Sequence, residues 1–201
     1  MYNKIVFATG NEHKMQEIRM ILSNVGLEIY SLKDLNIQIE IEEDGKTFEE
    51  NALKKASEIA KAIKVQEAIV LADDSGLEID YLNKEPGIFS ARYAGEDTSY
   101  DIKNNLLLKR LEGVEAERRT ARFVCAIAAV FPDGRAEVVK ETMEGQIGNH
   151  IEGENGFGYD PIFFLPEYGC TSAELSPEQK NEVSHRGKAL REMCKVIKGR
   201  I

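Results

Sequence analysis

The sequence predicts an α/β protein with a mixed β-sheet. The first half of the chain alternates short apolar segments, typical of strands, with longer segments whose apolar residues recur every three or four positions, typical of helices. The second half begins with two long strand patterns, 121–131 and 135–147, separated only by Pro132, Asp133 and Gly134. So tight a turn predicts an antiparallel hairpin.

The remaining elements follow from local patterns. The other predicted strands are short and apolar and cover residues 4–8, 27–30, 37–41, 69–72, 77–82 and 162–165. The predicted helices carry apolar stripes and run from Asn11 to about Leu22, over 48–63, 99–111 and 187–197, with a short one starting at Pro177. Thr47 with Glu50, and Ser176 before Pro177, are helix-start signals. In the helix at 99–111, the residues expected to face the core are Ile102, Leu106, Leu107 and Leu111.

Length and composition indicate an ordinary globular protein. The 201 residues are 42% hydrophobic and 30% charged, enough for one large domain with a substantial core. The net charge of -9 disfavours binding of long nucleic acid through a broad basic face. A small anionic substrate would need a few converging cations or a bound metal.

Targeting and redox features indicate a cytoplasmic protein. No apolar run is long enough for a membrane span, and the first strand is too short for the apolar region of a secretory signal. Cys125, Cys170 and Cys194 are odd in number and widely spaced, which suits a reducing compartment.

Two adjacent acids end the apolar run at residues 69–72. Asp73 and Asp74, followed by Ser75 and Gly76, are expected to form a turn at the carboxyl end of a buried strand. Carboxylates beside a buried strand are costly unless they are paired or bound to a metal. The hypothesis is a divalent cation facing a phosphate site, and the alternative is a solvated turn.

The segment after the first strand suits phosphate. A strand, a turn with Gly10 and a helix capped by Asn11 build a phosphate-binding helix N-terminus. Lys14 lies in the first helical turn, where a cation opposes the helix dipole, and this placement is explained if it serves an anion; a plain surface lysine is the alternative. The glycine spacing excludes both a Walker A loop and a dinucleotide-binding loop.

Other polar stretches complement these groups. The acidic turn at 42–44 offers a second carboxylate, and Lys55 in the following helix can reach a phosphate. The stretch at 153–161 alternates glycines with Phe157 and Tyr159, which suits stacking on a planar base; the alternative is a tight loop whose aromatic rings fill the core. His185 and Arg186 stand before the last helix and suit an anion or a carbonyl oxygen.

In α/β sheets, ligands bind beyond the carboxyl ends of the strands. Asn11, Lys14, Asp74 and one of Glu42 and Glu43 are therefore expected to line one cleft. Lysines together with carboxylates predict magnesium bound with a polyphosphate.

Six ordered motifs, spread over nearly the whole chain, resemble the inosine triphosphate pyrophosphatase family. They are residues 9–14, 42–51, 73–77, 86–93, 156–161 and 184–187. The resemblance implies hydrolysis of ITP, dITP and XTP to the monophosphate and pyrophosphate. It also implies one domain over residues 1–201 with two lobes, an elongated central mixed sheet flanked by helices, a cleft between the lobes, Mg²⁺ as cofactor and a homodimer.

Site residues are implied motif by motif. Asp74 is implied to be the proton acceptor and a magnesium ligand, Ser75 to touch the substrate, and Glu42 or Glu43 to be the second metal ligand. The triphosphate-binding set is Thr9, Gly10, Asn11, Glu12, His13, Lys14 and Lys55. The base-binding set is Phe157, Gly158, Tyr159, Asp160, Lys180, His185 and Arg186, preceded by Asn155 where many members have glycine.

Two alternatives belong to other functional classes or substrates. One is a pyrophosphatase that acts on other modified nucleotides through the same magnesium site. The other is a non-catalytic nucleotide sensor, which the acidic pair disfavours. Because Asp74 is a poor base while it binds a metal, positioning of the attacking water is the expected role of its carboxylate.

Overall fold

The computed structural model describes residues 4–23, 26–63 and 68–200. The chain forms two compact units. The first contains the residues up to Asp74, Cys125–Glu141 and the residues from Arg186 onward, and the second contains Ser75–Val124 and Thr142–His185. The strands are β1 (Lys4–Phe7), β2 (Glu28–Ser31), β3 (Ala68–Ile79), β4 (Thr120–Val130), β5 (Ala136–Ile147), β6 (Phe163–Leu165) and β7 (Cys170–Thr171). The helices are α1 (Glu12–Leu22), α2 (Phe48–Ile63), α3 (Tyr100–Arg110), α4 (Pro177–Val183) and α5 (His185–Lys198).

The strands form one mixed sheet in the order β2-β1-β3-β4-β5-β6-β7. β1 runs parallel to both β2 and β3, while β6 runs antiparallel to both β5 and β7. β4 and β5 are neighbours joined by a short turn in which the Phe131 N–H donates to the Arg135 carbonyl at 2.9 Å. The predicted α/β class and the predicted hairpin are confirmed.

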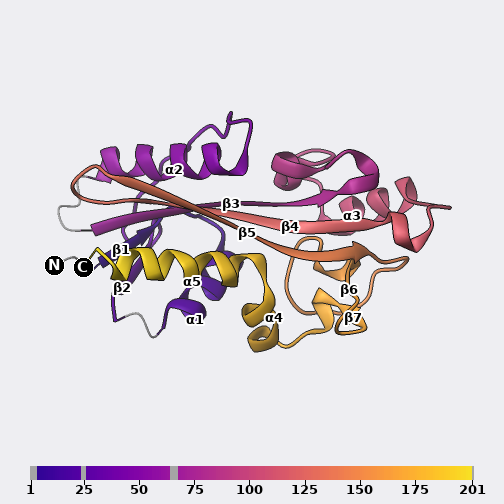
Figure 1. The fold of residues 1–201 in the computed structure, drawn as a ribbon. Helices are drawn as coiled ribbons and strands as arrows, with labels where there is room; N and C mark the ends of the chain where they lie inside the picture. Colours follow the sequence, from indigo (N-terminus) through magenta and orange to yellow (C-terminus); the bar gives the residue numbers. More distant parts are fainter. Residues whose placement is uncertain (1–3, 24–25, 64–67, 201) are drawn as a thin grey trace. The chain divides into compact units, whose positions relative to one another are not determined.

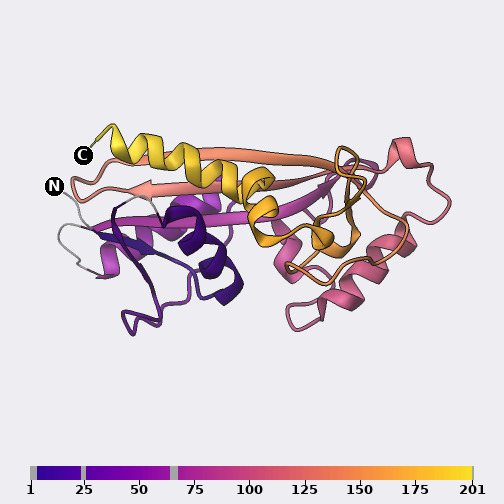
Figure 2. The ribbon, with the colours of Figure 1, turned by 90° about the horizontal axis from the view of Figure 1, so that it is seen from below.

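In the first unit, helices cover both faces of the sheet. Figure 1 shows α2 on one face and α1 with α5 on the other, and Figure 2 looks onto the face that α1 and α5 cover. The shared core on the α1 and α5 side contains Ile5, Phe7, Ile18, Ile69, Leu71, Leu190 and Met193. Alternate residues of β1 and β3 therefore face opposite helices, which explains their continuous apolar runs.

Two strand predictions are wrong. The segment at 37–41 forms no strand. None of its side chains is buried, and the segment pairs with no strand among the described residues. The acids at 73 and 74 do not end a strand either: β3 continues through them to Ile79. Buried apolar side chains resume at Leu77, and neighbouring polar groups offset the cost of the two carboxylates.

In the second unit, α3 does not face the core as predicted. Ile102 and Leu106 are 54% and 38% exposed, while Lys103 and Asn104 are each 1% exposed. Leu107 and Leu111 are buried, as expected, in a core shared with Phe123, Met143, Tyr159 and Phe163. The spacing of apolar residues does not predict which side of this helix is buried. Neighbouring segments present backbone carbonyls to the helix, and these carbonyls need donors such as Lys103 and Asn104.

No helix within the described residues is long and apolar enough to cross a membrane.

Candidate active site

Asp73 lies at the centre of a buried ionic cluster in the first unit. Its carboxylate lies 2.9 Å from Lys14 Nζ and 3.4 Å from Arg186 Nη2. Lys55 Nζ donates to the Asp73 backbone carbonyl at 3.0 Å. Burial acts to raise the pKa of Asp73, but Lys14, Arg186 and Lys55 outweigh it and hold that pKa far below its ordinary value. Asp73 is thus a fixed anion that gathers three cations.

Asp74, the next residue of β3, has a different environment. Asn51 of α2 donates from Nδ2 to Asp74 Oδ2 at 2.9 Å, and Asn51 Oδ1 accepts from the Gly45 N–H at 2.8 Å. Burial raises the pKa of Asp74 to about 6, and the nearby Glu43 carboxylate acts in the same direction. Two adjacent carboxylates therefore have pKa values pushed in opposite directions, a pattern typical of catalytic sites.

Of the two glutamates in the acidic segment, Glu43 is the one near Asp74. Its Oε1 lies 2.8 Å from Lys55 Nζ, and its charge acts on Asp74. Burial acts to lower the pKa of Lys55, but Asp73 and Glu43 raise it overall. Glu42 is exposed. Lys54, the neighbouring helix lysine, instead pairs with Asp44 at 2.6 Å. The structure therefore favours Glu43 over Glu42 as the partner of Asp74.

The first turn of α1 lies at the end of β1. Asn11 caps this helix by accepting from the Lys14 N–H at 3.1 Å, as the sequence predicts. The Asn11 N–H donates to Thr9 Oγ1, which shapes the turn. Gly10, Asn11, Glu12 and His13 are exposed, and the cation of Lys14 is directed to Asp73. This exposed helix N-terminus with an adjacent lysine suits an anion.

Arg186 connects α5 to both α1 and β3. It is buried and forms ion pairs with Asp73 and with Glu17 of α1. Its two carboxylate partners outweigh burial and raise its pKa. Sequence reasoning missed Glu17, because one acid on an amphipathic helix looks like any solvated charge. The resemblance implies a base-binding role for Arg186; in this structure its guanidinium lies in the Asp73 cluster of the first unit.

The residues around Asp74 fit a magnesium ion. The described residues contain no group of three or more His, Cys, Asp or Glu side chains placed to hold a metal. Asp74 and Glu43 nevertheless supply two carboxylates, and Mg²⁺ is often held by one or two carboxylates with substrate phosphates and water completing its shell. The donor set therefore suits a cation that binds together with a phosphorylated substrate.

A second polar cluster, in the second unit, is centred on Asp160. Its Oδ2 lies 2.7 Å from Lys180 Nζ and accepts from the Phe157 N–H at 2.8 Å. Its Oδ1 accepts from Ser172 Oγ at 3.0 Å. The Lys180 ammonium also lies 5.0 Å from the centre of the half-buried Phe157 ring. The loop at 156–160, here called the glycine loop, is thereby pinned by its own aspartate.

The remaining predicted residues of this unit have distinct surroundings. Tyr159 is a core residue: its ring lies edge-on to Tyr100 at 5.2 Å, and its hydroxyl donates to the Ser90 carbonyl at 2.7 Å. Of the two aromatic residues considered for stacking on a base, only Phe157 is therefore partly accessible. The His185 ring stacks on the Phe123 ring, with their centres 4.9 Å apart. Ser75 is half-buried and follows Asp74 in β3.

Gly156 leaves no room for a side chain. A Cβ there would lie 2.3 Å from Asp160 Oδ2, and its φ is +75°. Gly169 has a similar φ of +66° but no atom within 4 Å of an added Cβ. We expect Gly169→Ala to lower the free energy of unfolding by about 1–2 kcal/mol from the backbone alone. Gly156→Ala should cost about 1–3 kcal/mol more, because the methyl displaces the Asp160 carboxylate.

Urea unfolding of both variants measures this difference. Equal losses of stability in the two variants would contradict the close packing of Asp160 against Gly156.

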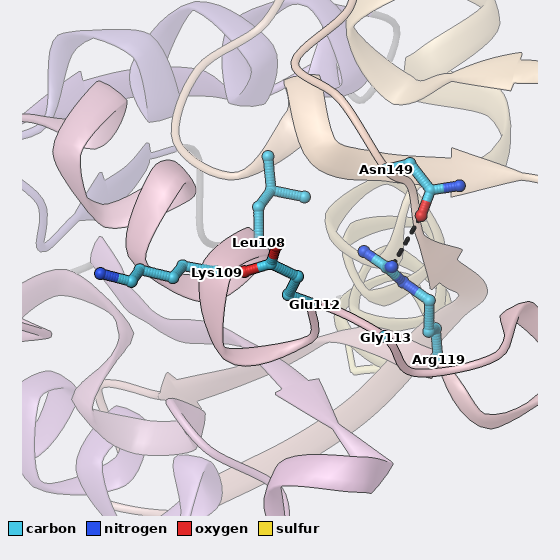
Figure 3. Close-up of a pocket in the computed structure, with 6 residues that line it drawn as sticks. All are labelled: Leu108, Lys109, Glu112, Gly113, Arg119 and Asn149. Carbon is cyan, nitrogen blue, oxygen red and sulfur yellow. Dashed lines mark hydrogen bonds between the residues drawn. The ribbon is translucent and has the colours of Figure 1, made fainter.

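A pocket of about 390 Å³ elsewhere in the second unit contains none of the predicted site residues. It is lined by Leu108, Lys109, Glu112, Gly113, Arg119 and Asn149 (Figure 3). Arg119 is buried and donates to Asn149 Oδ1 at 2.7 Å and to the carbonyls of Ile147, Gly148 and Leu111. Leu111 directly follows α3 and Ile147 ends β5, so the guanidinium serves mainly to satisfy backbone acceptors at the ends of these two elements.

The chain is similar to known proteins over nearly its whole length. The sequence profile of the Ham1 family matches residues 5–196. A dITP/XTP pyrophosphatase of Clostridium perfringens is 48% identical over 199 residues, 98% of each chain. The structure of the Staphylococcus aureus Ham1 protein matches with a TM-score of 0.86 and 41% identity, covering 98% of this chain and 100% of that one. A dITP/XTP pyrophosphatase structure from Mycobacterium abscessus matches with a TM-score of 0.74 and 43% identity, over 94% of this chain and 98% of that one.

Proposed function

This chain belongs to the Ham1 family, and from that premise we propose that it is a nucleoside triphosphate pyrophosphatase that hydrolyses dITP, XTP and ITP to the monophosphate and pyrophosphate. Relatives that bear the name dITP/XTP pyrophosphatase match it over nearly their whole length. The observation that carries the proposal is the pair Asp73 and Asp74, in which one carboxylate gathers cations and the other has a raised pKa.

Asp74 orients the attacking water in this proposal. Its carboxylate is fixed by Asn51, which leaves the oxygen not bound to Asn51 available to accept from water. Without a metal, burial raises the pKa of Asp74 to about 6. A bound cation would lower this pKa again, so the proposed role of the carboxylate is to position the water rather than to act as a strong base. Phosphoryl chemistry needs little more from the protein than this orientation and charge stabilisation.

Lys14 and Lys55 neutralise the phosphates. Both ammonium groups already lie at the Asp73–Asp74 segment, with Lys14 on the Asp73 carboxylate and Lys55 on its carbonyl. The exposed N-terminus of α1 adds backbone donors for a phosphate oxygen. We assign Thr9, Gly10, Asn11, Glu12 and His13 to this contact.

Asp74 and Glu43 hold the proposed Mg²⁺. When bound, the cation supplies charge neutralisation on the phosphate oxygens. Burial and the Glu43 carboxylate favour the protonated form of Asp74. A cation bound near Asp74 would oppose them and stabilise its ionised form.

The second unit provides the proposed purine contacts. Phe157 is the stacking residue, and Asp160 with Lys180 fixes the glycine loop around it. Discrimination of a 6-oxo purine from adenine requires donors that face that oxygen. Arg186 and backbone N–H groups are the candidates for this donor; in this structure the Arg186 guanidinium pairs with Asp73 and Glu17.

Pyrophosphate release from a panel of nucleotides tests the proposal. With Mg²⁺, turnover of dITP, XTP and ITP should exceed that of GTP and ATP by a large factor, and chelation by EDTA should abolish it. Faster turnover of a modified dTTP would favour the alternative of a pyrophosphatase for other modified nucleotides. Nucleotide binding without any pyrophosphate release would leave only the sensor.

Glu43 and Glu42 form a matched pair for testing the metal. We expect Glu43→Gln to raise the Mg²⁺ concentration needed for half-maximal activity roughly tenfold or more, because it removes one of two proposed carboxylate ligands. Glu42→Gln, at an exposed position, should change this concentration little. A Mg²⁺ titration of both variants at saturating substrate measures the effect. The reverse order of the two variants would assign the ligand to Glu42.

We further propose that residues 1–201 form one two-lobed domain that assembles as a homodimer in the cytoplasm. The family resemblance supports the assembly. Cys125, Cys170 and Cys194 form no disulfide within the described residues, which suits a reducing compartment. Sedimentation equilibrium at micromolar concentration tests the dimer, and a monomer mass would contradict it.

A further inference from the structure

Helix α3 buries polar residues where its sequence offers apolar ones. Lys103 and Asn104 are each 1% exposed, although Ile102 and Leu106 of the same helix lie in solvent. Lysine is almost never fully buried unless it is paired, and burial lowers the pKa of Lys103. No carboxylate within the described residues forms an ion pair with Lys103. An arrangement this costly calls for a role other than core packing.

Both side chains hold backbone carbonyls of the second unit. Asn104 donates from Nδ2 to the carbonyl of Gly158, at the middle of the glycine loop, at 3.1 Å. Lys103 donates from Nζ to the carbonyl of Ala91 at 2.5 Å, and its ammonium lies 4.9 Å from the Tyr100 ring centre. Gly158 has a φ of +72°, a backbone conformation that residues with a side chain rarely adopt.

Tyr159 joins the two carbonyl contacts into one connected set. It follows Gly158, and its hydroxyl donates to the carbonyl of Ser90, the neighbour of Ala91. Its ring lies edge-on to Tyr100, the first residue of α3. Helix α3 therefore fixes the glycine loop directly through Asn104. Through Lys103 it also fixes the segment at 90–91, to which Tyr159 of the loop is hydrogen-bonded.

We propose that Lys103 and Asn104 are positioning residues for nucleotide binding: they hold the glycine loop in the one conformation that presents Phe157 to the substrate. The inference rests on the proposed function, because it assigns the glycine loop to the substrate. Neither side chain contacts the Asp73–Asp74 cluster among the contacts described. The loss should therefore appear in substrate affinity and leave the chemical step intact.

Asn104→Leu is the primary variant. It keeps the volume and the helix but leaves the Gly158 carbonyl without its donor. We expect KM for dITP to rise roughly tenfold, with kcat changed less than about twofold. Asn105→Leu is the matched control: Asn105 is exposed on the same helix, and its Nδ2 donates to the Asp101 carbonyl one turn away. It should leave KM unchanged.

Lys103→Met separates positioning from stability. A methionine fills the space of the lysine stem. Removing the cost of a buried cation offsets the loss of the hydrogen bond to Ala91, so the free energy of unfolding should stay close to that of the wild type. KM should nevertheless rise severalfold, because Ala91 loses its donor. If Lys103 had only a structural role, its replacement would not raise KM in a variant that is as stable as the wild type.

Three outcomes decide the inference. Wild-type protein that releases no pyrophosphate from dITP, XTP or ITP would overturn the proposed function, and the positioning roles with it. Active wild type with unchanged KM in Asn104→Leu and Lys103→Met would overturn the positioning roles alone. If Asn104→Leu is unstable, Leu107→Ala serves as a control for instability, because it removes an apolar side chain from the same buried face. An equal rise of KM in Leu107→Ala would also overturn the inference.

Discussion

Asp74→Asn is expected to lower kcat for pyrophosphate release by roughly a thousandfold while nucleotide affinity stays nearly unchanged. An amide is nearly isosteric with the carboxylate and can keep one polar contact to Asn51, but it can neither accept a proton from water nor provide a negative charge for a cation. Because the variant is nearly inactive, binding of dITP itself can be measured by calorimetry, alongside kcat from pyrophosphate release.

Asp133→Asn provides the control for this chemical change. Asp133 lies in the exposed turn between β4 and β5 and pairs with Arg135. The Asp133→Asn variant should retain the wild-type kcat. Turnover of Asp74→Asn within a few-fold of the wild type would remove Asp74 from the reaction and transfer the proton-accepting role to another group.

Asp73→Asn is expected to have its largest effect on folding. Asp73 is 1% exposed and is the shared partner of Lys14 and Arg186. Removing one partner of a buried ionic cluster leaves uncompensated charge, and we expect the free energy of unfolding to fall by about 3–5 kcal/mol. Urea denaturation monitored by circular dichroism measures the change. A fall of less than about 1 kcal/mol would show that Asp73 is not the anion that holds the cations together.

Asp74→Asn separates the two acids in the same experiment. Burial raises the pKa of Asp74, so its charge is unfavourable in the folded state, and an amide should keep or increase stability. The neighbouring aspartates should thus give opposite results: one variant unstable, the other stable and inactive. Equal destabilisation by both would contradict the division of roles.

Several parts of the site followed from the sequence because they depend on local chemistry. The Asn11 cap and the expected place of Lys14 beside the acidic pair follow from the strand–turn–helix order after β1, because β1 and β3 are adjacent parallel strands. The ion pair of Lys14 with Asp73 did not follow from the sequence. The choice between Glu42 and Glu43 did not follow, because both stand in an irregular segment without a period. Glu43 is distinguished by its contact with Lys55 and by its charge acting on Asp74, while Glu42 is exposed.

The predictions about Tyr159 and α3 show a second limit. A tyrosine between two glycines resembles a ligand contact, yet its ring lies in the core and its hydroxyl bonds Ser90. Apolar spacing placed Ile102 and Leu106 in the core, yet the helix turns Lys103 and Asn104 inward. In both cases backbone carbonyls of distant segments decide the orientation, and a sequence does not reveal which carbonyls lack donors.

The sequence by itself determined the α/β class, the hairpin and the motifs that place this chain in its family, because these depend on periodicity and on residue order. The tertiary structure alone decided that β3 runs through its acids, that Asp73 binds cations while Asp74 has a raised pKa, and that Arg186 joins Asp73 and Glu17. The physical reason is that the free energy of a buried charge depends on the partners that folding brings within a few ångströms, and those partners lie 59 residues away for Lys14 and 113 for Arg186.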